Sequence, residues 1–132
     1  MIITDELKRA ISQACDEAGS QSAFAKKTGV KQQNVNRYLN GLVKEMSPYI
    51  LAKMWPHIYR FMPKDCGAEI LSISNEYQDK YMIFVLMQKT LNDIGADSLF
   101  FNIMTYWYGM SEEKKKEVFK QIYLIANQAK DK

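Results

Sequence analysis

Residues 21–41 of the chain read QSAFAKKTGVKQQNVNRYLNG, and this stretch decides the fold that we expect. Ser22 can cap a short helix that ends before Gly29, and the residues from Gln32 to Leu39 can form a second short helix. Gly29 can adopt the positive φ of a tight turn at no steric cost. The stretch therefore predicts two short helices joined by a tight glycine turn.

The second of these helices has an outward face without an acid. Val30, Val35 and Tyr38 are the positions that we expect to face inward. The outward side chains all donate hydrogen bonds and are Lys31, Gln32, Gln33, Asn36 and Arg37, with Asn34 nearby. Gln and Asn can pair bidentately with adenine, and Arg with guanine, in the major groove of DNA. Neighbouring phosphates can be neutralised by Lys26, Lys27 and Lys31. This pattern is typical of a helix-turn-helix that reads double-stranded DNA.

The segment resembles the helix-turn-helix of the Cro/CI (Xre-type) repressors of phages and bacteria. The resemblance covers about half of the chain and depends on Ala25, on the run from Gly29 to Val35, and on the closing pair Asn40-Gly41. It implies a five-helix, lambda-repressor-like DNA-binding domain over residues 4–62. The chain departs from the family at Leu39, where a glutamate is common, and in the loop from Leu42 to Met46.

The resemblance also implies roles for individual residues. Gln21, at the start of the first short helix, would contact a phosphate and brace the recognition helix. The base edges would be read by Gln32, Gln33 and Arg37. Asn40 and the backbone after it would lie along the sugar-phosphate chain.

The remaining helices are predicted from apolar spacing and capping signals. Before the motif, a helix is expected over residues 4–18. After it, Ser47-Pro48 begins another helix, which Pro56 should break or kink, and a further short helix follows to Met62. Three more helices are expected over residues 75–94, over residues 97–108 and from Ser111 onward. The prediction is an all-α chain with a DNA-binding domain at residues 1–66 and a helical C-terminal dimerisation region at residues 67–132.

Aromatic residues are concentrated in this C-terminal region. It holds ten of the sixteen in the chain: Tyr77, Tyr81, Phe84, Phe100, Phe101, Tyr106, Trp107, Tyr108, Phe119 and Tyr123. Three helices cannot easily bury so many large rings by themselves. The rings can pack on the N-terminal half, line a pocket or form a dimer interface. We favour a homodimer interface, because repressors of this type bind two half-sites about one DNA turn apart.

Composition and charge exclude several classes of protein. The 132 residues are too few for a Rossmann or barrel enzyme, and the longest apolar run, from Tyr81 to Met87, is too short for a membrane helix. The single histidine, His57, and the two distant cysteines, Cys15 and Cys66, form no metal, disulfide or catalytic pattern. We therefore expect no enzyme activity, no cofactor and no membrane partner, and a cytoplasmic location.

The net charge of +3 is unevenly divided along the chain. Residues 1–66 carry ten Lys/Arg and six Asp/Glu, a net of +4, whereas residues 67–132 carry eight and nine, a net of −1. The positive excess lies in the half that holds the motif, which suggests a polyanionic partner for that half.

The sequence thus leads to two hypotheses. The first is a sequence-specific, dimeric DNA-binding regulator, a phage- or prophage-type repressor that acts by occupying its operator. The second is an antitoxin-type interaction protein, whose C-terminal half binds a partner protein.

Overall fold

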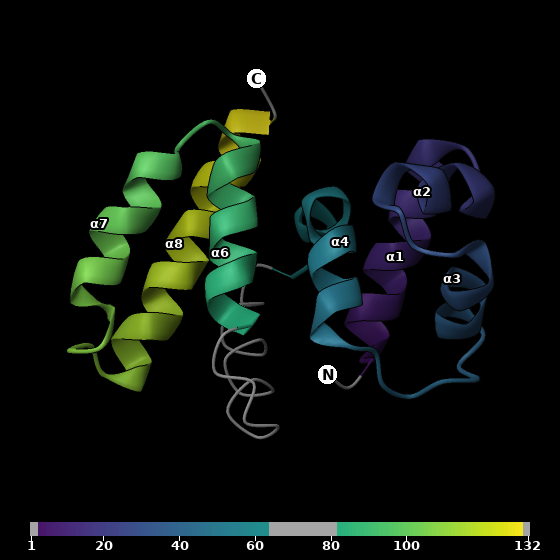
Figure 1. The fold of residues 1–132 in the computed structure, drawn as a ribbon, viewed down its shortest axis with the longest axis horizontal. Coiled ribbons are helices and arrows are strands. Elements are labelled where there is room, and N and C mark those ends of the chain that lie inside the picture. Colours follow the sequence, from purple (N-terminus) through teal and green to yellow (C-terminus); the bar gives the residue numbers. More distant parts are fainter. Residues whose placement is uncertain (1–2, 64–81, 131–132) are drawn as a thin grey trace. The chain divides into compact units, whose positions relative to one another are not determined.

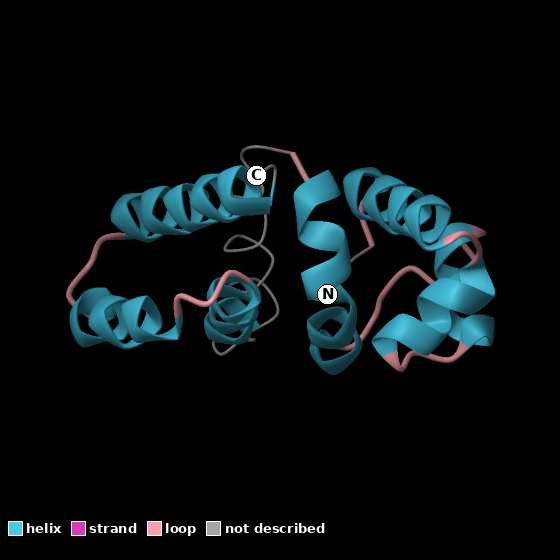
Figure 2. Cartoon of the chain, turned by 90° about the horizontal axis from the view of Figure 1, so that it is seen from above, coloured by secondary structure: helices cyan, strands magenta, loops and turns pink. Residues whose placement is uncertain are grey.

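The structure is a computed structural model that describes residues 3–63 and 82–130. The regular elements in these two ranges are helices, and neither range contains a strand (Figures 1 and 2). The predicted all-α class is therefore confirmed for the described part of the chain. The chain divides into two compact units, Met1–Pro63 and Lys64–Lys132. The boundary predicted between residues 66 and 67 lies outside the described residues.

The first unit is built around its N-terminal helix. Its elements are α1 (Asp5–Ala18), α2 (Gln21–Thr28), α3 (Gln32–Leu39), α4 (Pro48–Ile58) and the 3-10 helix η1 (Tyr59–Phe61). α1 packs against each of the other four elements (Figure 1). Its side chains Leu7, Ala10 and Ile11 are fully buried, because they repeat at the three- and four-residue spacing of one helix face. This central packing holds α2 and α3 in a fixed relation to the rest of the unit.

The residue that caps the start of α2 differs from the predicted one. The Ala23 N–H donates to Oγ of Ser20 at 3.0 Å, so Ser20 caps the helix rather than Ser22. Ser20 has an extended backbone, as an N-cap residue needs, whereas Ser22 is the second residue of the helix. The consequence is that Gln21, a candidate site residue, becomes the first residue of α2.

Of the break or kink predicted at Pro56, the break was wrong, because α4 continues through this proline to Ile58. Proline lacks an N–H and costs about 3 kcal/mol inside a helix. Trp55, Ile58 and Tyr59 are fully buried around it, and burial of each large apolar side chain contributes about 1.5–3 kcal/mol. Tertiary packing therefore outweighs the local effect of the proline, and only the short η1 follows.

In the second unit, the described residues 82–130 form three helices. They are α6 (Met82–Asp93), α7 (Asp97–Trp107) and α8 (Glu112–Lys130), and α6 packs against both of the others. Leu86 and Met87 of α6 and Phe119 of α8 are almost completely buried. Residues 75–81 of the helix predicted over residues 75–94, including Tyr77 and Tyr81, lie outside the described residues.

No helix within residues 3–63 and 82–130 has both the length and the apolar character that a membrane span requires.

Candidate nucleic-acid interface

The turn between α2 and α3 sets the geometry of the candidate site. Gly29 has φ +76°, and its N–H donates to the carbonyl oxygen of Ala25 at 2.9 Å. Buried Thr28 connects the two sides of the turn: Oγ1 donates to the Phe24 carbonyl oxygen at 3.0 Å and accepts from the Val30 N–H at 3.3 Å. The sequence analysis did not single out Thr28, although a Thr-Gly pair at a helix end could have drawn attention to it.

The inward face of α3 fixes which side chains point outward. Val35 is fully buried, and Val30 and Tyr38 are 5% exposed, as their spacing predicts. Burial raises the pKa of the Tyr38 hydroxyl, so this side chain stays neutral at physiological pH. Because these three residues attach α3 to the core, the opposite face must lie toward solvent.

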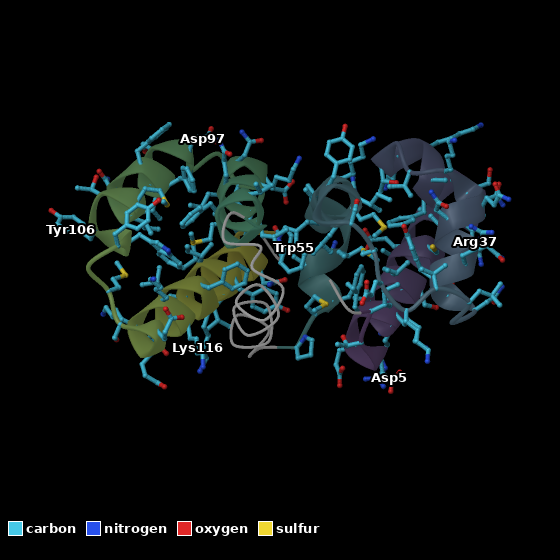
Figure 3. The ribbon with its side chains drawn as sticks, turned by 60° about the horizontal axis from the view of Figure 1, so that its bottom comes forward. Asp5, Arg37, Trp55, Asp97, Tyr106 and Lys116 are labelled. Carbon is cyan, nitrogen blue, oxygen red and sulfur yellow. The ribbon has the colours of Figure 1, made fainter. Side chains whose placement is uncertain are left out.

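The outward face of α3 brings together most of the predicted site residues. Its exposed side chains are Lys31, Gln32, Gln33, Asn36 and Arg37, while Asn34 is half-buried. Figure 3 shows Arg37 directed away from the body of the first unit. No acidic residue occurs between Glu17 and Glu45, so α2, α3 and the turn between them carry only positive formal charge. Such a face suits an anionic partner with hydrogen-bonding groups.

Three predicted site residues form a chain of side-chain amides. Nδ2 of Asn40 donates to Oδ1 of Asn36 at 2.7 Å, and Nδ2 of Asn36 donates to Oε1 of Gln21 at 3.3 Å. The chain connects the first residue of α2, the middle of α3 and the residue that ends α3. The Nε2 group of Gln21 takes no part in this chain, so Gln21 can position Asn36 through Oε1 and still donate a hydrogen bond to another acceptor.

A shallow surface hollow lies on the outward face of α3. It is lined by Gln32, Gln33, Asn36, Arg37 and Leu42. Leu42 was not among the predicted site residues, and it is 73% exposed. The signal in the sequence was an apolar residue directly after the Asn-Gly pair, at a position where the chain has just left the helix.

The predicted phosphate-contacting lysines do not all lie together. Lys26 and Lys31 line a second shallow hollow with Gly29 and Gln32, and Lys27 does not line it. All three lysines are exposed, and none forms an ion pair with a carboxylate in the described part of the chain. Lys26 and Lys31 are therefore placed beside the N-terminal end of the α3 face, whereas Lys27 lies outside this hollow.

Metal-ligating groups do not gather anywhere in the described ranges. No cluster of three or more His, Cys, Asp or Glu side chains there could hold a metal ion. Cys15 is buried, and burial followed by the nearby Asp16 charge raises the pKa of its thiol. A neutral thiol is a poor nucleophile and a poor metal ligand, so this residue acts as part of the core.

Comparisons with known families, with curated proteins and with solved structures gave no match to this chain.

Proposed function

We propose that this chain is a sequence-specific DNA-binding regulator of the Cro/CI type, a phage- or prophage-type repressor that acts as a dimer by occupying its operator. In this proposal residues 1–66 form a lambda-repressor-like helix-turn-helix domain. The observation that carries the proposal is the outward face of α3, which is exposed, free of acidic residues and rich in amide and guanidinium groups. These are the groups that read base edges in the major groove.

The α2–α3 geometry supports a specific docking mode. An α-helix with its side chains is about 10–12 Å in diameter, so α3 fits the major groove of B-DNA, which is about 12 Å wide. With α3 in the groove, Gln32 and Gln33 face adenines and Arg37 faces a guanine. The N-terminus of α2 directs backbone N–H groups and the Nε2 group of Gln21 toward a phosphate. Lys26, Lys27 and Lys31 contribute sequence-independent attraction to the backbone.

The second unit supports the dimer part of the proposal. Residues 98–111 contain no charged residue, and the exposed aromatic side chains there are Phe101 (67%) and Tyr106 (70%) of α7 and Tyr108 (78%), which follows α7 directly. Figure 3 shows Tyr106 directed away from the other helices of its unit. At roughly 200 Å² for each of these side chains, the three offer about 400 Å² of apolar area. A standard interface buries about 800 Å² on each partner, of which somewhat more than half is apolar, so the exposed rings of this uncharged segment together offer an apolar area of the size that self-association needs.

Selection of bound duplexes from a random DNA library tests the proposal. The native protein, Gln33→Ala and the matched control Gln13→Ala, at an exposed position of α1, are compared in parallel. We expect a palindromic consensus for the native protein and the control, and loss of definition at one base pair of each half-site for Gln33→Ala. The spacing of the half-sites reports the dimer geometry, with about 34 Å between their centres.

A selection that yields no consensus would contradict the proposal, most clearly if binding also vanishes by about 200 mM salt. The exposed aromatic side chains of the uncharged segment 98–111 then favour the second candidate function, an antitoxin-type protein that binds a partner protein through them. A protein that copurifies in a fixed ratio and is lost on Tyr106→Glu would support that function.

A further inference from the structure

Leu42 is the one apolar side chain that lines the hollow on the outward face of α3. Its position relative to α3 is fixed by the backbone: the Leu42 N–H donates to the Arg37 carbonyl oxygen at 3.1 Å. The preceding Gly41 N–H donates to the Tyr38 carbonyl oxygen at 3.4 Å. The side chain is therefore held beside the C-terminal end of the recognition surface while remaining 73% exposed.

Single exposed leucines are common on protein surfaces and by themselves indicate nothing. Leu42 differs because three of its four neighbours in the hollow, Gln32, Gln33 and Arg37, read base edges in the proposed function. Among the described side chains of residues 3–63, the other large apolar one of similar exposure is Tyr49, and Nζ of Lys53 lies 4.7 Å from the centre of its ring. Leu42 can donate no hydrogen bond and carries no charge, so it cannot act on a phosphate or on a polar base edge.

The apolar group that the major groove presents is the C5 methyl group of thymine, and apolar side chains recognise it by contact. We propose that Leu42 is a specificity-determining residue that packs against a thymine methyl group, next to the base pair faced by Arg37. This inference rests on the proposed function. It adds an A·T preference at one further base pair of each half-site, set by apolar contact rather than by a hydrogen bond.

The test removes the methyl group and the side chain in combination. In the consensus duplex, each thymine of a half-site is replaced in turn by deoxyuridine, which lacks only the C5 methyl group. Affinities of the native protein and of Leu42→Ala are measured for every duplex. Burial of one methyl group corresponds to about a fourfold change in affinity. We expect one replacement to weaken native binding about fourfold and to leave Leu42→Ala unchanged.

Two control variants separate this contact from general effects. Leu42→Met keeps an apolar side chain and should keep the response to deoxyuridine, whereas Tyr49→Ala removes an equally exposed side chain from α4 and should also keep it. The inference is overturned if native protein and Leu42→Ala respond alike to every replacement. It is also overturned if Leu42→Ala weakens all duplexes equally, which would indicate contact with deoxyribose. A native protein that selects no consensus at all overturns the proposed function and this inference together.

Discussion

The turn at Gly29 provides the sharpest test of the α2–α3 geometry. Gly29 has φ +76°, a backbone conformation that residues with a side chain rarely adopt. A Cβ atom built at this position meets no atom within 4 Å. Substitution by alanine therefore tests the backbone conformation alone, without a steric clash.

The expected cost follows from two opposing terms. An L-residue in the left-handed region costs about 1–2 kcal/mol. Alanine also restricts the unfolded chain, which stabilises the folded state by about 0.4–1 kcal/mol and offsets part of this cost. The net destabilisation of Gly29→Ala should be about 1 kcal/mol. Gly29→Asn should cost less, because asparagine tolerates the left-handed conformation better than alanine does.

Hydrogen exchange of the intact chain, followed by mass spectrometry on peptides, measures this cost in each unit. A loss of 1 kcal/mol raises the exchange rate of amides that open with the unit about fivefold. Gly29→Ala should raise the exchange of α1–α3. The matched control is Gly95→Ala, with φ +72° and also nothing within 4 Å of the added Cβ, and it should raise the exchange of α6–α8.

Two results would refute the reasoning. If Gly29→Ala leaves exchange in α1–α3 unchanged, the turn does not use a positive φ, and the relation between α2 and α3 is different. If the cost exceeds about 3 kcal/mol, the added methyl group meets packed atoms, because left-handed strain alone does not reach that value.

Three further predictions concern binding, capping and titration. Arg37→Ala should cost about 1–3 kcal/mol of binding free energy and relax base preference. Lys27→Ala should weaken binding to all sequences and lower the slope of log affinity against log salt concentration by about one. Affinities measured on consensus and scrambled duplexes at several salt concentrations check both predictions. Ser20→Ala should destabilise the first unit by about 1 kcal/mol and Ser22→Ala by much less, because Ser20 Oγ accepts the capping hydrogen bond. Thermal denaturation measures the difference. Burial raises the pKa of the Cys15 thiol, so the folded state holds this proton more tightly than the unfolded state does. The stability that results is present at neutral pH and is lost as the pH rises through the ordinary thiol range toward the folded pKa. Between roughly pH 8 and pH 10, the thermal midpoint of the native protein should therefore fall more steeply than that of Cys15→Ala, and parallel curves would show that the thiol does not titrate differently on folding.

The positions of α2 and α3 followed from signals within a few residues of one another. The bounds Gln32–Leu39 agree with the sequence prediction, because apolar spacing, a glycine turn and a closing Asn-Gly pair are local features. The same local spacing identified Val35 and Tyr38 as inward positions. Most of the outward face of α3 could therefore be predicted without a tertiary structure.

Two predictions from local signals were wrong: the residue that caps α2 and the break at Pro56. Ser20 and Ser22 are both good capping residues two positions apart, and the cap is made by the residue whose backbone stays extended. Pro56 is a strong local breaker, but α4 continues because Trp55 and Ile58 bury their side chains in the core. Both outcomes depend on how the helices pack, which a window of neighbouring residues does not contain.

The sequence by itself determined that the described part of the chain is helical, where α3 begins and ends and where α2 ends, and that the outward face of α3 is basic and rich in amides. The tertiary structure alone decided that Gln21, fifteen residues before Asn36 in the chain, accepts a hydrogen bond from it. It also decided that Leu42 lines the same hollow as the polar side chains of α3. The physical reason is that periodicity and capping are local, whereas the docking of one helix on another is set by the burial of distant side chains against α1.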